Sequence, residues 1–133
     1  MTATAFADTS FYVALNHRRD ALHPTAVAAA AAPRPVVTTE FVLLEVANFF
    51  VRPGDREKLV AFEANLRADP NTAVVPASAD LFARGLALFA ARPDKEWSLT
   101  DCISFVVMGE LGLTDALTAD HHFAQAGFTP LLA

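Results

Sequence analysis

The sequence VVTTEFVLLEVANFFVRPG, residues 36–54, contains the change of pattern that decides the fold. Its first four residues, Val36–Thr39, are all β-branched and predict a buried strand. An apolar run without a helix breaker extends from Glu40 to Val51, and Pro53-Gly54 ends it, so we expect a helix there. A strand that passes directly into a helix is half of a βαβ unit, from which parallel sheets are built.

The same alternation of short apolar segments and longer helical segments continues on both sides of this stretch. Four further strands are expected at Thr4–Ala7, Ala73–Pro76, Ala116–Thr118 and Phe128–Leu131. Helices are expected from the cap at 8–10 through 15, and over 21–32, 55–68, 79–91, 98–111 and 121–125. Strands separated by helices of this length predict an α/β fold with a parallel sheet. The 133 residues are enough for one core, so we expect a single domain over 1–133.

The composition excludes several classes of protein. Hydrophobic residues make up 53% and charged residues 19% of the chain, which excludes intrinsic disorder. The formal net charge of -5 excludes binding to nucleic acid through bulk positive charge, so such contact requires a local patch or a metal. A single cysteine, Cys102, excludes an internal disulfide and a cysteine-based zinc cluster. The longest apolar runs, 26–33 and 102–109, are shorter than the roughly 20 residues that span a bilayer. Residues 1–15 have no basic leader, and we expect a soluble cytoplasmic protein.

Two aspartates follow predicted strands. Asp8 comes directly after the strand at 4–7, and Asp120 follows the strand at 116–118. Because the carboxyl ends of parallel strands lie along one edge of a sheet, both side chains are expected at the same rim. The alternative is that each aspartate caps the helix that follows it, a role that aspartate fills well. The residue pattern leaves both interpretations open.

Glu45 interrupts the apolar helix predicted over 40–51. A helix that is apolar on nearly every face is largely buried, and ionised carboxylates are seldom buried unless they are paired or bound to a metal. Asn48, one turn later, shares the surroundings of Glu45. The alternative is that Glu45 and Asn48 form a narrow stripe facing solvent. Glu40 lies in the first turn, where a negative charge favours the helix dipole, and we leave it out of the site.

Asp101 occupies the third position of the helix opened by Ser98, in the pattern of a capping box. Capping accounts for an acid at this position. Residues 102–108 are almost wholly apolar, however, which places Asp101 at the mouth of a buried helix near the rim of the sheet. Ser104, one turn later, is within reach of a carboxylate or a water molecule, and the alternative for Ser104 is a small residue that packs in the helix.

The four acids Asp8, Glu45, Asp101 and Asp120 would bring like charges into one pocket. Such a cluster is unfavourable unless a cation neutralises it or protons are retained. A set of oxygen ligands without cysteine suits Mg²⁺ or Mn²⁺ better than zinc. Either ion lowers the pKa of a bound water molecule and stabilises the charge on a phosphate during in-line attack. The chemistry indicated is hydrolysis of a phosphodiester bond.

Four segments in order resemble those of a known family. They are Ala7-Asp8-Thr9-Ser10, Leu44-Glu45-Val46, LTDCISF at residues 99–105 and LTADHHF at residues 117–123. Together with Ala126-Gly127-Phe128, they make the sequence resemble a PIN-domain ribonuclease over nearly its whole length, particularly the VapC-type toxins of bacterial type II toxin–antitoxin pairs. The resemblance implies a PIN-like three-layer α/β/α sandwich with a central, mostly parallel sheet of four to five strands.

The resemblance also implies an activity and a site. It implies an endoribonuclease that hydrolyses RNA phosphodiester bonds, with one or two Mg²⁺ or Mn²⁺ ions held by Asp8, Glu45, Asp101 and Asp120. The metal would activate water for attack on an RNA phosphate. Residues expected to support the four acids are Thr9, Ser10, Asn48, Ser104 and Thr118. The implied partners are RNA, a small antitoxin that lies along the groove, and a second copy of the chain that packs through its helices.

Other side chains have surface or core roles as their first interpretation. The adjacent His121 and His122 are expected to point in different directions, which disfavours metal ligation. Phe49, Phe50 and Phe62 are expected in the core, with a dimer or antitoxin face as the alternative. Basic residues in predicted loops and helix ends are expected to be solvated, with contact to RNA phosphates as the alternative. They are Arg18, Arg19, Arg52, Arg56, Lys58, Arg92 and Lys95.

Rival functions make different demands on the sequence. A receiver-like phosphate-signalling domain also gathers acids at the rim of a parallel sheet, but it requires a lysine near a late strand, and Lys58 and Lys95 are the only lysines. A haloacid-dehalogenase-type phosphatase requires a second aspartate two positions after the first, where this chain has Ser10. A zinc protease is excluded because the chain lacks His-Glu-x-x-His. A PIN-like module that binds nucleic acid or a partner without activity stays open.

Overall fold

The computed structural model describes residues 3–133; Met1 and Thr2, the first residues of the segment expected to lack a leader, lie outside the described residues. Five parallel strands form one sheet in the order β3-β2-β1-β4-β5. They are β1 (Ala5–Ala7), β2 (Val36–Thr39), β3 (Thr72–Val75), β4 (Asp115–Leu117) and β5 (Thr129–Pro130). The predicted parallel sheet of four to five strands is confirmed, and the strands differ from the predicted ranges by one residue at some ends.

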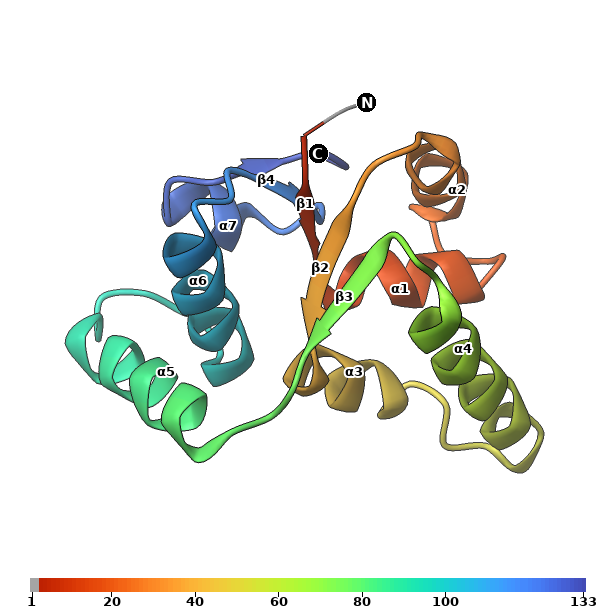
Figure 1. Cartoon of the computed structure of the whole chain (residues 1–133), viewed down its shortest axis with the longest axis horizontal. Coiled ribbons are helices and arrows are strands. Elements are labelled where there is room, and N and C mark those ends of the chain that lie inside the picture. The colour runs from red at the N-terminus through yellow and green to blue at the C-terminus, as the bar shows by residue number, and fades with distance from the viewer. Residues whose placement is uncertain (1–2) are drawn as a thin grey trace.

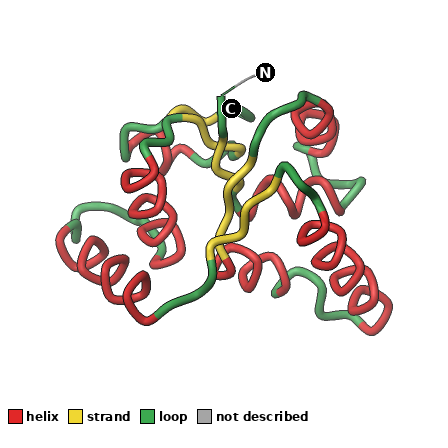
Figure 2. Tube along the Cα trace, in the orientation of Figure 1, coloured by secondary structure: helices red, strands yellow, loops and turns green. Residues whose placement is uncertain are grey.

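Helices cover both faces of this sheet. Figure 1 shows α1, α2 and α4 on one side and α5, α6 and α7 on the other, with α3 starting at the carboxyl end of β2, and the tube in Figure 2 shows the strands between the two groups. The helices are α1 (Thr9–Asn16), α2 (His23–Ala31), α3 (Glu40–Ala47), the 3₁₀ turn η1 (Pro53–Asp55), α4 (Arg56–Ala68), α5 (Ala79–Ala91), α6 (Leu99–Leu111) and α7 (His121–Gln125). Across residues 3–133, no helix has the length and hydropathy required to cross a membrane.

The strand order separates this fold from that of a receiver domain. Receiver-like sheets have the order 2-1-3-4-5, with the first strand second from one edge. Here β1 lies in the centre, between β2 and β4, with Ala5 opposite Val36 on one side and Ala7 opposite Leu117 on the other. The receiver-like interpretation is therefore wrong at the level of the sheet, and the three-layer sandwich is confirmed.

The helix α3 ends at Ala47, whereas the sequence predicted a helix to Val51. The amides of Phe49 and Phe50 each bond to the carbonyl three residues earlier, at 3.0 Å, so the chain leaves the helix through tight turns. These turns bury Phe50 against His17, whose ring centroid lies 5.0 Å away. They also leave Phe49 54% exposed, so the expectation of Phe49 in the core is wrong.

Two other helices begin later than predicted. The helix α2 begins at His23 because Pro24 takes its second position, where a missing N–H is tolerated, and the preceding Asp20 accepts a hydrogen bond from the amide of Leu22 at 2.8 Å. The helix predicted over 55–68 begins as α4 at Arg56, after the turn η1. A proline lies at each of these starts, Pro24 within the first turn of α2 and Pro53 in η1 just before α4.

The core is centred on β1, whose three residues are fully buried. Tyr12 and Trp97 are 3% and 5% exposed and belong to this core, as does the single cysteine Cys102. On α5 the apolar residues at helical spacing divide between two environments. Leu81 is buried, while three others are 46–47% exposed. These three are Phe82, Leu86 and Phe89.

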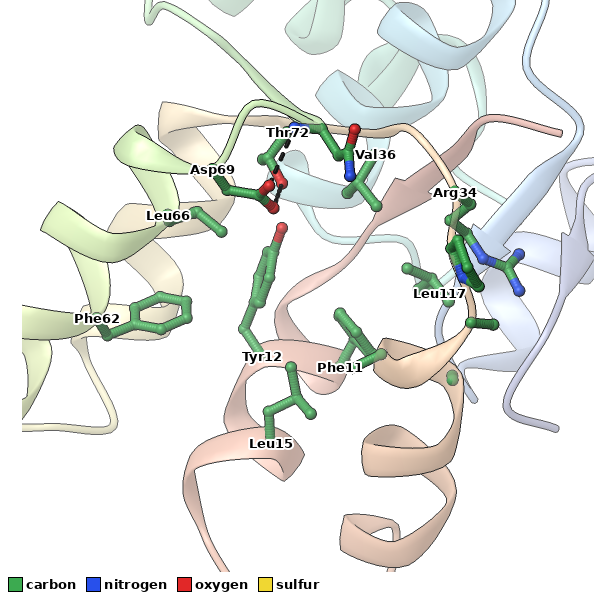
Figure 3. A pocket seen from close by; sticks show the side chains of 15 residues that line it. Phe11, Tyr12, Leu15, Arg34, Val36, Phe62, Leu66, Asp69, Thr72 and Leu117 are labelled. Atoms are coloured by element: carbon green, nitrogen blue, oxygen red, sulfur yellow. Dashed lines mark hydrogen bonds between the residues drawn. The ribbon is translucent and has the colours of Figure 1, made fainter. Parts of the chain in front are cut away.

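A pocket of about 230 Å³ lies between α1, α2 and α4, near the amino ends of β2 and β3. Figure 3 shows Tyr12 extending between these elements with its hydroxyl directed toward Asp69. The Tyr12 ring packs edge-on against Phe62 at 5.3 Å. Burial raises the pKa of the Tyr12 hydroxyl, and the charge of Asp69 adds to the rise. This pocket is at the opposite end of the sheet from the carboxyl termini of the strands.

The close contact of α5 with α6 depends on Gly85. A Cβ atom at this position would meet Ile103 Cγ1 and would lie 3.2 Å from Ile103 Cα, so the backbones leave no room for a side chain. We expect Gly85→Ala to lower the free energy of unfolding by about 1–3 kcal/mol through overpacking, as measured by urea unfolding.

Gly109→Ala is the matched control, because Gly109 lies in α6 and a methyl group at this position would have no neighbouring atom within 4 Å. Alanine there is expected to be neutral or to stabilise by up to about 1 kcal/mol through helix propensity. Equal effects of the two substitutions would contradict the packing argument.

Candidate functional site

The sheet has a topological switch point at β1. From β1 the chain moves outward to β2 and β3, and it later returns to β4 on the other side of β1. In an open parallel sheet a crevice forms beyond the carboxyl ends of the strands at such a point. A cleft of about 600 Å³ lies there. It is lined by Asp8, Thr9, Ser10, Val13, Asp20, Leu22, Glu45, Asn48, Phe49, Asp101 and Asp120.

The cleft brings together all four acids predicted from the sequence, Asp8, Glu45, Asp101 and Asp120. They come from the end of β1, the middle of α3, the first turn of α6 and the cap of α7. Three of the five residues predicted to support them also line the cleft. These are Thr9, Ser10 and Asn48.

Asp8 lies at the N-terminus of α1, but its side chain makes no capping hydrogen bond. Its Oδ2 accepts hydrogen bonds from the hydroxyls of Thr118, at 2.9 Å, and Ser10, at 3.4 Å. Burial raises the pKa of the Asp8 carboxyl to about 7 against the opposing effect of hydrogen bonds, and the charges of Asp101 and Glu45 add to the rise. The capping interpretation of Asp8 is therefore wrong, and its carboxylate faces other acids.

Thr118 connects two of the acids. Its hydroxyl donates to Asp8 Oδ2 at 2.9 Å and accepts the amide hydrogen of Asp120 at 3.0 Å. The Ser10 hydroxyl lies 3.2 Å from the Thr118 oxygen and 3.4 Å from Asp8 Oδ2, and its single proton serves one of these two oxygens at a time. Thr118 is fully buried just after β4. One hydroxyl thus fixes the position of Asp8 relative to Asp120.

Asp101 and Asp120 cap helices and also face the cleft. Ser98 and Asp101 form a capping box, in which Asp101 Oδ2 accepts the amide hydrogen of Ser98 at 3.1 Å. Asp120 Oδ1 accepts the amide hydrogen of His122 at 2.9 Å. For these two residues the predicted cap and the predicted position at the rim are both found, because each cap engages one carboxylate oxygen.

His122 lies between these two acids. Its Nδ1 is 3.3 Å from Asp101 Oδ2 and 3.2 Å from Asp120 Oδ1, and its side chain is 18% exposed. His121 is 74% exposed, and its ring centroid lies 4.4 Å from that of His122, so the expectation that the two side chains point in different directions is wrong. One ligand atom each from Asp120, His121 and His122 falls within a group 4.8 Å across. Sequence reasoning did not place His122 beside the acids.

The helix α3 is less buried than predicted. Val42 and Val46 are fully buried, but Leu44 is 66% exposed. Glu45 is partly exposed and Asn48 is exposed, and both line the cleft. Glu45 and Asn48 therefore face the cleft. They lie neither in the core nor on a convex surface stripe.

Lysine and arginine side chains do not balance the negative charges of the four acids in the cleft. Within residues 3–133, each lysine or arginine ion pair involves an acid outside this group of four. Burial raises the pKa of the Asp101 carboxyl, and the charge of Asp120 adds to the rise. The hydroxyl of Thr9 lines the cleft, is buried and has no hydrogen-bond partner among the described residues. These oxygens fit a hydrated divalent cation such as Mg²⁺ or Mn²⁺.

Two residues differ from the predicted site. Ser104 is fully buried without a hydrogen-bond partner in the described part of the chain, and it does not line the cleft, so it is a small residue packed in α6. Asp20 lines the cleft although sequence reasoning did not select it. Nothing in the local pattern Arg18-Arg19-Asp20 distinguishes it from an ordinary loop acid.

Comparison with known proteins gives matches over nearly the whole chain. The model of a family described as "PIN domain" matches residues 5–129. The chain is 35% identical over 124 residues to the 23S rRNA-specific endonuclease VapC20 of Mycobacterium tuberculosis, from both the CDC 1551 and the H37Rv strains, with 92% of this chain and 94% of the relative covered. The crystal structure of M. tuberculosis VapC20, described as a sarcin–ricin loop cleaving toxin, matches with a TM-score of 0.83 and 32% identity over 96% of this chain and 97% of that one.

The raised pKa of Asp8 predicts how the stability of the metal-free protein depends on pH. A folded-state pKa of about 7, above the ordinary value of 3.8, favours the folded protein at low pH, and this contribution disappears as the pH rises through 7. With a chelator present, the free energy of unfolding is expected to fall by on the order of 2 kcal/mol between pH 5 and pH 8. Urea unfolding at both pH values measures this change.

Asp8→Asn provides the control, because an amide keeps the shape of the side chain and does not ionise. The variant should lose most of this decline and should be more stable than the unmodified chain at pH 8 in chelator. A decline of the same size in Asp8→Asn would assign the pH dependence to other groups.

Proposed function

The chain belongs to the PIN-domain family, and we propose that it is a metal-dependent endoribonuclease, the toxin of a type II toxin–antitoxin pair. The observation that carries this proposal is the convergence of Asp8, Glu45, Asp101 and Asp120 on one cleft without a lysine or arginine partner among residues 3–133. The name of the relative, a 23S rRNA-specific endonuclease, supports RNA as the substrate.

The residues that would hold Mg²⁺ or Mn²⁺ are Asp8 and Asp101 as the central ligands, with Glu45 beside them and Asp120 acting directly or through water. The bound ion would supply an activated water molecule and neutralise charge that develops on the phosphate. The unpartnered hydroxyl of Thr9 is positioned to orient water in the cleft. The number of bound ions, one or two, depends on how many of the four carboxylates coordinate the same ion.

The chain's own residues prepare this site before the substrate arrives. Thr118 holds the Asp8 carboxylate by its hydroxyl and the Asp120 backbone by the same oxygen. Ser98 fixes Asp101 through the capping box, so rotation of that side chain is restricted. Such preorganisation lowers the reorganisation needed in the transition state. Ser10 supports Thr118 and Asn48 adds an amide at the rim.

The partners follow from the same proposal. The RNA is structured ribosomal RNA in the first instance, because the related toxin is described as cleaving the sarcin–ricin loop. Such a substrate places the activity in the cytoplasm. A small antitoxin would cover the groove and block the acids. A homodimer is proposed because α5 exposes three apolar side chains at helical spacing. They are Phe82, Leu86 and Phe89.

Cleavage of RNA by the purified protein tests the proposed activity. We expect cutting of ribosomal RNA with added Mg²⁺ or Mn²⁺ and none after chelation. Asp8→Asn and Asp101→Asn should each lower the rate by at least about 100-fold, because each removes a charged ligand from the metal. Gel analysis of end-labelled RNA measures the rate, and circular dichroism checks that both variants are folded.

The exposed acid Glu57 on α4 serves as a control position, since Glu57→Gln should leave the rate unchanged. Normal cleavage by both aspartate variants would overturn the assignment. Binding of RNA without cleavage under every metal condition would favour the inactive PIN-like module. Growth arrest on expression, relieved by co-expression of a small neighbouring gene, would identify a toxin.

Thr118→Val tests the proposed positioning of the acids. Valine keeps the volume of threonine but leaves Asp8 without its closest hydrogen bond. We expect the Mg²⁺ concentration for half-maximal cleavage to rise by about 10-fold, with much of the rate restored at saturating Mg²⁺. Thr118→Ser retains the hydroxyl and should behave as the unmodified chain. An unchanged Mg²⁺ requirement in Thr118→Val would limit Thr118 to a structural role.

A further inference from the structure

The cleft that holds the four acids also has an apolar wall. This wall consists of Val13 on α1, Leu22 in the loop before α2, and Phe49 in the turn after α3. It lies beside the carboxylates in the same cleft of about 600 Å³. Metal ligation by carboxylates does not account for an apolar surface at this place.

Phe49 is the most exposed member of the wall, with 54% of its surface accessible to solvent. The turns after α3 bury the adjacent Phe50 to 3% exposure and direct Phe49 outward, so the exposure follows from a defined backbone. Phe49 comes four residues after Glu45, and both line the cleft. The Phe49 ring and the four carboxylates therefore line one cleft.

Positive charge is located in the loops beside this wall. Among residues 3–133, Arg18, Arg19 and Arg52 are exposed and have no acidic side chain within 4.0 Å. Arg18 and Arg19 precede Leu22, and Arg52 follows Phe49. Elsewhere on the surface Arg67, Arg84 and Arg92 pair with acids, while Arg56 at the start of α4 is exposed and, among the described residues, also has no acid within 4.0 Å. Although the net charge is -5, Arg18, Arg19 and Arg52 provide local positive charge where a polyanion would approach the cleft.

We propose that the apolar wall binds one unpaired base of the RNA, stacked on Phe49, next to the phosphate that is cleaved. This inference rests on the proposed ribonuclease function and adds a substrate requirement to it. The acids would hold the metal and the phosphate, the arginines would contact neighbouring phosphates, and Phe49 would provide the stacking surface. Aromatic side chains stack on bases of every kind, so the wall selects an unpaired conformation more than a base identity.

The geometry disfavours a base-paired nucleotide at this position. In an A-form helix both faces of each base are covered by neighbouring bases, and the ring of Phe49 would have no face to contact. A nucleotide in a loop or bulge has an exposed face and is free to turn into the cleft. Cleavage is therefore directed to loops of structured RNA, with the wall acting as the selector.

The experiment combines variants of Phe49 with a substrate that lacks one base. The cut position in a hairpin RNA is mapped first, and two further hairpins then carry an abasic ribose on either side of the cut. We expect Phe49→Ala to lower kcat/KM by about 10-fold, mainly through KM. Phe49→Trp, which retains a stacking surface, should keep the activity. Leu111→Ala is the control, since Leu111 is an apolar residue of similar exposure, 52%, at the end of α6 and outside the cleft and the proposed dimer surface.

The abasic substrates make the test specific to stacking. One of the two abasic hairpins should be cut by the unmodified chain about 10-fold less efficiently, and Phe49→Ala should cut that hairpin no more slowly than the unmodified chain does. The proposal would be overturned if the effects of Phe49→Ala and of the missing base on cleavage efficiency multiplied when combined. Normal cleavage of the intact hairpin by Phe49→Ala would also overturn it. If Phe49→Ala weakens only the binding of a protein partner, the wall is a protein-binding surface and the proposal is wrong.

Failure of the proposed function is distinguishable from failure of this inference. RNA binding to Asp8→Asn, measured by fluorescence anisotropy without cleavage, is compared with binding to the Asp8→Asn, Phe49→Ala double variant. Weaker binding of the intact hairpin by the double variant, with equal binding of a fully paired duplex RNA, supports stacking on an unpaired base even if no RNA is cut. Equal binding of the intact hairpin by both variants overturns it.

Discussion

Repulsion among buried carboxylates is the constraint on which the rest of this structure depends. Asp8 is 4% exposed, and the charges of Asp101 and Glu45 act on it without a lysine or arginine pairing with any of the four acids in residues 3–133. Neutral donors hold the carboxylates in place: the Thr118 hydroxyl, the Ser98 amide and the His122 amide. Hydrogen bonds of this kind fix direction without cancelling charge, so the cluster keeps its affinity for a cation.

The parallel sheet makes this arrangement possible because it delivers residues that are distant in sequence to one edge. Asp8 and Thr118 are 110 positions apart, yet β1 and β4 are neighbours and both end at the cleft. The helices α3 and α6 contribute their acids from opposite sides of the sheet. A site assembled from four segments requires the whole fold. The match of the chain to the PIN-domain family accordingly covers residues 5–129.

The sequence was informative where a polar residue contradicts its apolar surroundings. Glu45 within FVLLEVANFF and Asp101 before CISFVVM point to the site because an acid among apolar neighbours requires a reason, although Glu45 is only partly buried and faces the cleft. The end of α3 could not be predicted, because it depends on Phe50 packing against His17, a contact between distant residues. The same turn directs Phe49 to the cleft. Asp20 was missed and His122 was set aside because their roles depend on tertiary neighbours. Ser104 was included on spacing alone, which does not show the direction of a side chain.

The two characters of the cleft belong together. The four carboxylates alone would attract any hydrated cation and any phosphate bound to that cation. They would therefore provide chemistry with little selectivity among substrates. An apolar wall alone would expose hydrophobic surface with no reaction beside it. In the proposed complex both lie in one cleft, so a phosphate held at the metal would place its base against the wall only if that base is free of its partners. Selection would then precede chemistry, since a paired strand would be excluded from productive geometry before any bond is broken. The early end of α3 is the structural detail that joins the two, because it holds Glu45 and Phe49 on the same cleft.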